Sequence, residues 1–367
     1  MANITDSFIF EGEDFYNLFG NDSETISHIP KGQYICNNES MHLYKTIFQP
    51  LVYSVVFIVG LTGNGLLLTV LLQHRVHLRI TEIYLLHLAL ADLLLLLTFP
   101  FAVIQVMSGW IFGEFLCKFL GLLNRLNMIC GSLLLACISF DRYLAVVHAV
   151  SSLHSRRPKF VHLICVVLWL FCLAVTIPNM VFLSVGHNNE SEKMECYFNR
   201  HGIHANNWIL VSRFLIHILC FFLPLIVMGY CYGAVVLTLH QSQQSLEKKG
   251  AIRLAMVVTL VFCLCWLPYN ITVFVGTLVD LDVLSVKSCE LKSALYQSLV
   301  VTESIGFIHC CLNPILYAFI GVRFRKDLLR LLAKWGCGHV CTPMLGAGVL
   351  NRVSVSEVAT TTSSQYI

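Results

Sequence analysis

The sequence has little charge, since Asp, Glu, Lys and Arg make up only 12% of its 367 residues, whereas 57% are hydrophobic. Soluble domains usually carry about 25% charged residues. This composition therefore excludes a disordered protein, a collagen and an ordinary soluble enzyme. The net charge of +3 is also too small to indicate a nucleic-acid partner.

Motifs of catalysis and metal binding are missing as well. The 16 cysteines form no Cys-x-x-Cys pair, which argues against a zinc framework. HExxH, GxSxG and Walker motifs are absent, and no two histidines share a helix with an acidic partner at metal-binding spacing. We therefore expect a protein that is not an enzyme and that has no resident metal or cofactor.

The sequence instead has seven apolar stretches, each long enough to cross a bilayer as a helix. One such stretch could be a buried core helix, but seven with short polar loops predict an all-α membrane protein with a seven-transmembrane helix bundle. The predicted spans are 48–73, 83–107, 117–140, 160–185, 208–239, 252–279 and 294–320. Membrane helices tolerate internal prolines, which lie here at Pro100, Pro178, Pro224, Pro268 and Pro314.

Lys and Arg are distributed unevenly between the two sides of these spans. The segments after spans 1, 3, 5 and 7 hold 15 of them, whereas the segments on the other side hold 7. Basic loops stay cytoplasmic, so we expect the N-terminus outside and the C-terminus inside. With the acidic residues included, the net charge is −7 on the outer side and +10 on the inner side. Four glycosylation sequons fall on the outer side, at Asn3, Asn21, Asn38 and Asn189.

Four cysteines lie on the predicted outer side, and an even number in an oxidising compartment suggests two disulfides. The sequence alone leaves three pairings open among Cys36, Cys117, Cys196 and Cys289. On the inner side, residues 321–335 form a basic amphipathic stretch, which predicts a short interfacial eighth helix. Cys337 follows it and is either a palmitoylation site or an unmodified thiol.

Polar side chains inside a membrane span are costly and therefore suggest function. Asp92 lies in the middle of span 2, and we expect a hydrated polar cluster with Asn64 and Asn313 that could hold a sodium ion as an allosteric modulator. For the two asparagines, hydrogen bonding between helices is the alternative.

Three charged residues lie nearer the outer end of the spans, namely Arg125, Arg213 and Glu303. Two interpretations stay open for them. They could simply pair with each other, or they could line a mouth that receives a charged ligand.

Seven short motifs, one on each span, resemble those of the rhodopsin-like class of G-protein-coupled receptors along residues 48–335. Each is weak evidence alone, but seven in order imply that class and its fold. The motifs are Gly63-Asn64, Leu88 to Asp92, Asp141-Arg142-Tyr143, Trp169, Pro224 with Tyr232, Cys265-Trp266-Leu267-Pro268 and Asn313-Pro314-Ile315-Leu316-Tyr317.

Within that class the sequence resembles the chemokine receptors, and in particular their C-X-C branch. The blocks that carry this resemblance are DRYLAVVHAV at 141–150, Thr98-Phe99-Pro100, Trp110 and HCCLNPILYAF at 309–319. SRFLIH at 212–217 and other blocks are similar to the B-cell homing member of the branch, and its T-cell member shares many of them.

The resemblance implies two further features of the chain. One is the family's second disulfide, between Cys36 and Cys289, beside a first one that uses Cys117 and Cys196. The other concerns sodium: Gly131 stands where many receptors of the class have a serine that helps to hold the ion, which weakens the expectation of a sodium site at Asp92.

The implied function is that of a receptor for a basic C-X-C chemokine, and the B-cell-attracting chemokine is the ligand that the resemblance favours. It would act through heterotrimeric G proteins of the inhibitory class and drive chemotaxis of leukocytes such as B cells. The alternatives are a T-cell type of C-X-C chemokine receptor and an atypical scavenging receptor that internalises its ligand without signalling. A multispan transporter is the more distant alternative.

The N-terminal tail is acidic, which suits a basic ligand because opposite charge speeds association. Tyr16 follows two acidic residues and is a candidate for sulfation, more so than Tyr34. Glu303 matches the family's acidic anchor for the ligand N-terminus. The predicted ligand-binding residues are Glu11, Glu13, Asp14, Tyr16, Trp110, Arg125, Arg213, Tyr269 and Glu303.

A second set of residues is expected to transmit the signal to the G protein, with Arg142 held by Asp141 at rest. The set comprises Asp141, Arg142, Tyr143, Tyr232, Trp266, Pro268, Asn313, Pro314 and Tyr317. Hydroxyls near the C-terminus are expected to accept phosphate from a receptor kinase and then bind arrestin, at Ser354, Ser356, Thr360, Thr361, Thr362, Ser363 and Ser364.

These expectations divide the chain into four parts in the plasma membrane. They are an extracellular acidic tail (1–47), the seven-transmembrane bundle in the lipid bilayer (48–320), amphipathic helix 8 (321–335) and a cytoplasmic Ser/Thr-rich tail (336–367).

Overall fold

The structure is a computed structural model of the 367-residue chain. It describes residues 44–73, 78–148, 158–188, 193–198, 205–241, 246–281, 283–284, 288–320, 322–333 and 335. All structural statements concern these residues. Both predicted tails lie outside them, apart from residues 44–47.

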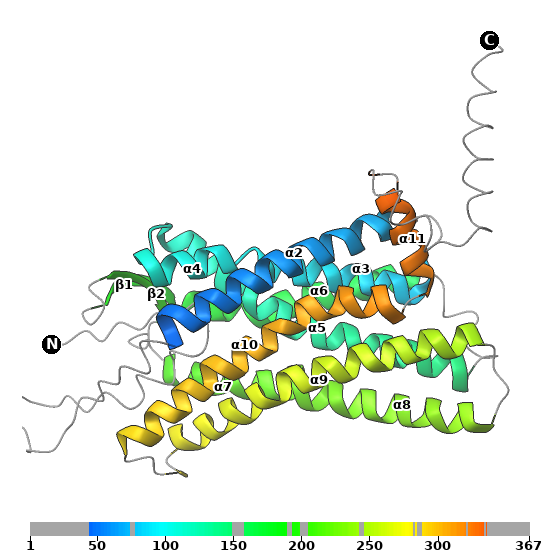
Figure 1. Ribbon diagram of the computed structural model, residues 1–367. Coiled ribbons are helices and arrows are strands. Elements are labelled where there is room, and N and C mark those ends of the chain that lie inside the picture. Colours follow the sequence, from blue (N-terminus) through cyan, green and yellow to red (C-terminus); the bar gives the residue numbers. More distant parts are fainter. Residues whose placement is uncertain are drawn as a thin grey trace, which may run out of the picture.

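The described chain forms a bundle of long helices, seven of which are long and apolar enough to cross a membrane. Figure 1 shows them side by side with their axes roughly along one direction. The seven-helix prediction is therefore confirmed. Three of the helices are single segments, α5 (Gly113–Val147), α6 (Pro158–Val181) and α9 (Leu246–Asp280).

The other spans combine shorter elements or continue into a further one. The first is a π-helical turn η2 (Tyr44–Phe48) followed by α2 (Gln49–Gln73), and the second is α3 (Ile80–Leu96) with α4 (Phe99–Ser108). The fifth joins α7 (Ala205–Leu215), a π-helical segment η4 (Ile216–Phe222) and α8 (Leu223–Gln241). The seventh, α10 (Cys289–Ile320), is followed by the short helix α11 (Val322–Leu332).

Proline and its neighbours explain where span 2 changes direction. Thr98 separates α3 from α4, and its hydroxyl and backbone N–H both donate to the Leu95 carbonyl, at 2.7 and 2.8 Å. Pro100 is the second residue of α4 and lies in its first turn, where the missing N–H costs no helical hydrogen bond. The Thr98-Phe99-Pro100 block thus divides the span into two helices.

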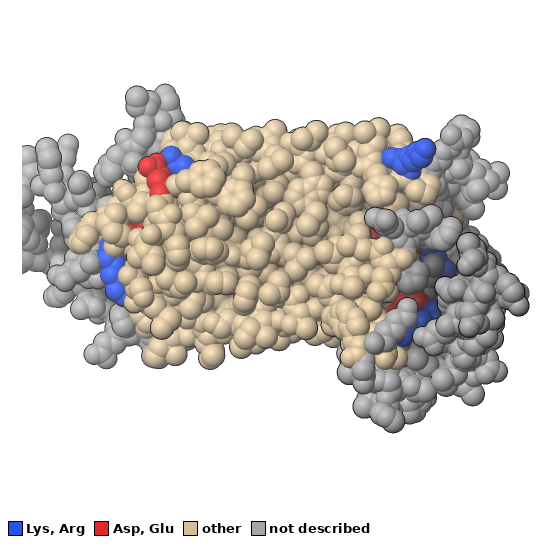
Figure 2. All heavy atoms as spheres, turned by 90° about the horizontal axis from the view of Figure 1, so that it is seen from above, with Lys and Arg blue, Asp and Glu red and all other residues tan. Residues whose placement is uncertain are grey.

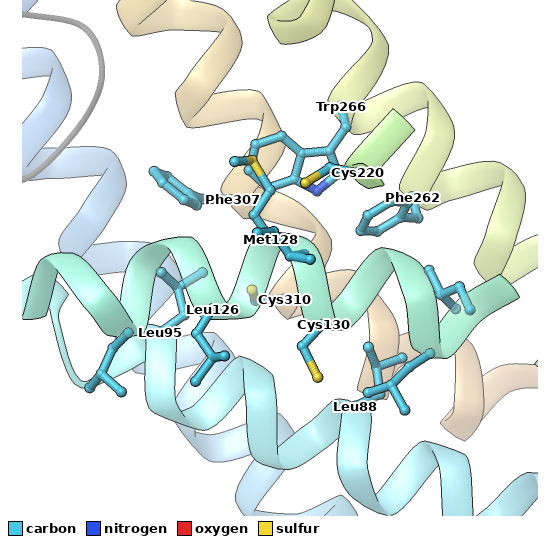
Figure 3. Packing of buried hydrophobic residues seen from close by; sticks show 14 of the residues in the cluster. Leu88, Leu95, Leu126, Met128, Cys130, Cys220, Phe262, Trp266, Phe307 and Cys310 are labelled. Atoms are coloured by element: carbon cyan, nitrogen blue, oxygen red, sulfur yellow. The ribbon is translucent and has the colours of Figure 1, made fainter. Parts of the chain in front are cut away.

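Helix α5 lies at the centre of the bundle and is buried along its length. It contacts α3, α6, α8 and α9. Met128 of α5 belongs to the same buried cluster as Trp266, Phe262 and Phe307, which come from α9 and α10 (Figure 3). One continuous apolar cluster therefore joins α5 to the helices packed around it.

A β-hairpin covers one end of the bundle, at the opposite end from α11 (Figure 1). Strand β1 (Leu183–Asn188) pairs with β2 (Lys193–Phe198) in antiparallel register, with Val185 opposite Cys196. The disulfide between Cys196 and Cys117 ties the hairpin to the start of α5, so this predicted pair is confirmed. The Cys36 partner of the other predicted disulfide lies outside the described residues.

The surface between the two ends is apolar. Large hydrophobic side chains such as Leu51, Ile58, Leu163 and Leu170 are more than half exposed. In Figure 2 the visible Lys, Arg, Asp and Glu side chains gather at the two ends, and the face between them shows none. This arrangement suits a protein whose middle is covered by lipid acyl chains.

Candidate functional site

Glu303, the predicted anchor for the ligand N-terminus, is a buried carboxylate on α10, 3% exposed. Its side chain interacts with the hydroxyl of Tyr53. That hydroxyl also accepts a hydrogen bond from Gln49 at 2.7 Å. Two guanidinium groups are buried as well, those of Arg125 on α5 and Arg213 on α7, at 8% and 6% exposure. Buried charges need partners of opposite sign or a charged ligand.

Aromatic rings form a chain that begins next to Glu303 and crosses the bundle. Tyr53 stacks on Phe99 at 5.0 Å between ring centroids, and Phe99 meets Phe307 at 5.2 Å. Phe307 contacts Trp266 at 5.9 Å, and Trp266 contacts Tyr269 at 5.5 Å. The chain joins α2, α4, α10 and α9, so a displacement at Glu303 would reach Trp266 through rings in direct contact.

Trp266 packs against the backbone of α10 at Gly306. A Cβ added to Gly306 would lie 2.9 Å from two ring carbons of Trp266. Only glycine therefore allows this approach of the indole ring to α10. Pro268 follows two residues later inside α9, where its missing N–H leaves one helical hydrogen bond unmade and allows a bend.

Trp110 is held in the loop that precedes α5. It is 2% exposed, its Nε1–H donates to the Gly113 carbonyl at 2.9 Å, and its backbone N–H donates to Met194 of β2 at 2.6 Å. Its ring meets Phe112 at 5.1 Å. These contacts fix the loop before α5 under the hairpin, and a direct contact between Trp110 and ligand stays a prediction.

Asp92 is fully buried at the middle of the bundle, and two amides hold its carboxylate. Asn313 Nδ2 donates to Oδ2 at 2.9 Å and Asn127 Nδ2 donates to Oδ1 at 3.2 Å. Asn64 does not complete this set in the described structure, because its Nδ2 donates to the backbone carbonyls of Gly60 and Cys310, at 3.0 and 2.8 Å. The alternative of interhelical hydrogen bonding thus holds for Asn64. A sodium ion at Asp92 stays a prediction.

Two side chains beside Asp92 were not among the predicted site residues. His309 Nε2 lies 3.5 Å from Asp92 Oδ1, and Cys310 Sγ lies 3.5 Å from the same oxygen. Both residues belong to the HCCLNPILYAF block at 309–319, and the sequence gives no further reason to expect them in the site. No sequence pattern indicates Asn127, because it and Asp92 are 35 positions apart in the chain and lie on different helices.

At the end of the bundle that faces α11, Arg142 is held by its neighbour. Its Nη2 lies 2.6 Å from Asp141 Oδ2 and also contacts the Thr81 hydroxyl of α3. Both members of the ion pair are largely buried, at 14% and 7% exposure. The predicted Asp141–Arg142 contact is therefore present, and Thr81 adds a partner that the sequence did not indicate.

Three tyrosines belong to the predicted signalling set. Tyr232 of α8 and Thr259 of α9 share a hydrogen bond at 3.3 Å. Tyr317 of α10 is 2% exposed, and its hydroxyl has no hydrogen-bond partner within the described part of the chain. Tyr143 contacts His148 at 3.0 Å. A hydroxyl buried without a partner is costly.

Several predicted residues lie outside the part that the structure describes. They include the ligand-binding residues Glu11, Glu13, Asp14 and Tyr16, and the glycosylation sites Asn3, Asn21, Asn38 and Asn189. The others are Cys36, Cys337, Tyr34 and the phosphate acceptors Ser354, Ser356, Thr360, Thr361, Thr362, Ser363 and Ser364. Their roles stay predictions.

Comparison with known proteins relates the chain to receptors. A profile described as "7 transmembrane receptor (rhodopsin family)" matches residues 63–317. C-X-C chemokine receptor type 5 of Mus musculus is 45% identical over 296 residues, which cover 80% of this chain and 79% of that receptor.

Other subtypes are similar at nearly the same level. C-X-C chemokine receptor type 3 of Bos taurus is 40% identical over 334 residues, covering 89% of each chain. C-X-C chemokine receptor type 1 of Homo sapiens is 40% identical over 336 residues, covering 92% of this chain and 93% of that receptor. The identities therefore do not separate one subtype from another.

Proposed function

Because the chain belongs to the rhodopsin family of seven-transmembrane receptors, and within it to the C-X-C chemokine receptors, we propose that it binds a C-X-C chemokine and activates inhibitory G proteins. It is a multi-pass membrane protein of a receptor family and not an enzyme. The B-cell-attracting chemokine is the first ligand to consider, since SRFLIH at 212–217 and other blocks are similar to the B-cell homing member of the branch. The receptor would lie in the plasma membrane of B cells, and its activation would drive their chemotaxis.

Capture of the ligand begins outside the membrane in this proposal. The outer side carries a net charge of −7, and seven of its acidic residues lie in the first 47 residues. A basic chemokine would be drawn to this tail and outer surface at a high rate. Sulfation of Tyr16 would add negative charge there. The tail then holds the folded body of the chemokine while its N-terminus enters the bundle.

Inside the bundle the chemokine N-terminus would meet Glu303. A terminal amine or basic side chain gains a charge-assisted hydrogen bond from a carboxylate that is already buried. Ligand would displace Tyr53 from its contact with Glu303 and move the aromatic chain that ends at Trp266. Arg125 and Arg213 would select against basic groups at the neighbouring positions, because like charges repel at short range.

The response at the inner end is the release of Arg142. Movement of α9 about Pro268 would separate Tyr232 from Thr259 and open the space beside Asp141. Arg142 could then leave Asp141 and Thr81 and contact a helix of the G protein, while Tyr317 acquires a partner. The ligand shifts the population toward this state only because it binds that state better.

The observation that carries the proposal is the closed Asp141–Arg142 pair at the opposite end of the bundle from Glu303. An intact pair of this kind favours a signalling receptor over a scavenging one. Nucleotide exchange on an inhibitory G protein, measured with a panel of C-X-C chemokines, tests it. Exchange stimulated by the B-cell-attracting chemokine supports the type 5 assignment. Exchange stimulated only by the chemokines of the T-cell type of C-X-C chemokine receptor supports type 3. Binding without exchange identifies a scavenger.

Desensitisation and anchoring complete the proposal. Phosphorylation of the hydroxyl cluster 354–364 would add about −1.5 to −2 charges at each site, which arrestin could recognise. Palmitate on Cys337 would fix the segment after α11 to the membrane. Mass spectrometry of the receptor from stimulated cells tests both, since it detects phosphate and thioester-linked palmitate directly.

A further inference from the structure

Three side chains of types that can bind metals meet at the centre of the bundle, and they come from two helices. Asp92 of α3 and the adjacent pair His309 and Cys310 of α10 are 0%, 1% and 0% exposed. Their ligand atoms all lie within 4.8 Å of one another. Asp92 Oδ1, His309 Nε2 and Cys310 Sγ form a triangle with sides of 3.5, 3.5 and 3.5 Å.

The triangle has the dimensions of a zinc site. Zinc binds oxygen and nitrogen at about 2.0–2.2 Å and sulfur at about 2.3 Å in tetrahedral geometry. In a tetrahedron the ligands are about 1.6 bond lengths apart, which gives roughly 3.3–3.8 Å between ligand atoms. The three observed sides fall in this range without any movement of the backbone.

Hydrogen bonding already orients the imidazole as a metal ligand. His309 Nδ1 lies 2.6 Å from the Gly306 carbonyl, which can only accept, so Nδ1 carries the proton. In the neutral ring, Nε2 then presents its lone pair to Asp92 Oδ1 and Cys310 Sγ. Donation of the second ring N–H to a backbone carbonyl is the usual support of a metal-bound histidine.

The carboxylate is supported in the same way. Asn127 and Asn313 donate to its two oxygens at 3.2 and 2.9 Å, from α5 and α10. Asn313 is 1% exposed, and its own amide oxygen has no hydrogen-bond partner in the described residues. The cluster thus combines a carboxylate held by two amide N–H donors, an imidazole lone pair, a thiol and an unpartnered amide oxygen.

We propose that Asp92, His309 and Cys310 form an allosteric site for one zinc ion, with the fourth position open. Zinc binding would replace the Cys310 thiol proton, which goes to solvent, and the metal would be balanced by the thiolate and the carboxylate. Imidazole and thiolate are ligands of zinc rather than of sodium. The site therefore favours a borderline-soft cation over the hard one expected at Asp92.

Zinc in this position would act on the signal. It would join α3 to α10 and fix His309, whose ring meets Trp266 at 5.5 Å and Phe262 at 5.4 Å. Both rings belong to α9, the helix that must move in the proposed response. Bound zinc would therefore favour the arrangement described here, with Arg142 paired, and reduce activation by ligand. The inference does not depend on which chemokine is bound.

Cobalt substitution tests the site without any assay of activity. The full-length receptor, purified in lipid nanodiscs and stripped with a chelator, is titrated with Co²⁺ and followed by absorption spectroscopy. A thiolate–cobalt charge-transfer band and the strong d–d bands of tetrahedral cobalt are expected, with zinc abolishing them by competition. Zinc should also raise the melting temperature, and more so at higher pH, because binding releases one proton.

The neighbouring thiol supplies a matched control. Cys310→Ser should lose the charge-transfer band and weaken cobalt binding by about 100-fold or more, beyond the effect of losing a supporting residue. Cys311→Ser should keep both, because Cys311 Sγ instead contacts the Val56 carbonyl at 3.5 Å. A band that is absent from the wild type, or equal in Cys310→Ser, overturns the proposal. So does a melting temperature raised by sodium and unaffected by zinc.

Discussion

Glu303 is the residue on which the proposed contact with the chemokine N-terminus depends. It is a carboxylate buried on α10 beside Tyr53. We predict that Glu303→Gln lowers chemokine potency by about 10- to 100-fold, or about 1.4–2.7 kcal/mol, because a charge-assisted contact becomes a neutral one. The measurement is the concentration–response curve for nucleotide exchange at matched surface expression.

Glu114→Gln is the control for this substitution. Glu114 is also a carboxylate at the hairpin end of the bundle, but it is exposed and pairs with Lys118 at 2.6 Å. Its neutralisation should leave potency within about twofold, since exposed pairs contribute little. Equal effects of the two substitutions would mean that Glu303 acts only through the general negative field.

Arg142 and Asp141 give a second prediction at the residue scale. Asp141→Asn removes the charge that holds Arg142, so basal nucleotide exchange should rise several-fold without ligand. Arg142→Ala should reduce ligand-stimulated exchange to background, while chemokine affinity changes little. If Asp141→Asn shows no rise in basal nucleotide exchange but still responds to chemokine, the pair does not restrain Arg142.

Among single residues, a charge inside a span is easier to predict from sequence than a contact between helices. The sequence indicates Asp92 and Glu303 because a charge in an apolar span is conspicuous, and it indicates Arg142 because Asp141-Arg142-Tyr143 resembles a motif of the receptor class. His309, Cys310 and Asn127 were missed, because their significance comes from contacts between helices that no spacing along the chain encodes. Histidine and cysteine in a span are also less conspicuous than a carboxylate.

At the scale of elements, the packing of α9 on α10 depends on Gly306. We predict that Gly306→Ala destabilises the receptor by about 1–3 kcal/mol, because the new methyl group overlaps the Trp266 ring. Its melting temperature should fall, and its basal exchange should change because Trp266 is displaced. Thermal unfolding in nanodiscs measures the first effect and nucleotide exchange the second.

Gly229→Ala is the matched control in another helix. A Cβ at Gly229 of α8 would have no described atom within 4 Å, and alanine is the better helix former by about 1 kcal/mol. The melting temperature should stay the same or rise slightly. A similar loss in both variants would show that the effect of Gly306→Ala is not specific to Trp266.

Hydropathy predicted the seven spans but not their ends. Helix α5 extends from Gly113 to Val147, beyond the expected 117–140, because the Asp141-Arg142-Tyr143 segment is polar and still helical. Span 4 was expected to continue to residue 185, but α6 ends at Val181 and Leu183 begins β1. That expectation was wrong because an apolar run does not distinguish a helix from a strand. The hairpin itself gave no sequence signal, and its place depends on the Cys117–Cys196 disulfide.

At the scale of the whole molecule, charge is divided between two ends of an apolar bundle (Figure 2). The sequence places −7 on the outer side and +10 on the inner side. We predict that the association rate of a basic chemokine falls by about tenfold when ionic strength rises from low to several hundred millimolar, since salt screens exposed charges beyond about 10 Å at 0.1 M.

Surface plasmon resonance on nanodisc-embedded receptor separates the two rate constants. The dissociation rate should change much less than the association rate, because it reflects the buried contact at Glu303 more than the field. An association rate that does not depend on salt would remove the acidic outer surface from the account.

The central claim is that a chemokine at the Glu303 end activates a G protein at the Arg142 end. Its most direct test is nucleotide exchange on a purified inhibitory G protein, with the receptor in nanodiscs and each C-X-C chemokine added in turn. The account predicts that at least one chemokine accelerates exchange on the wild type and fails to do so on Arg142→Ala, although it still binds. Tight chemokine binding without any acceleration on the wild type would contradict it.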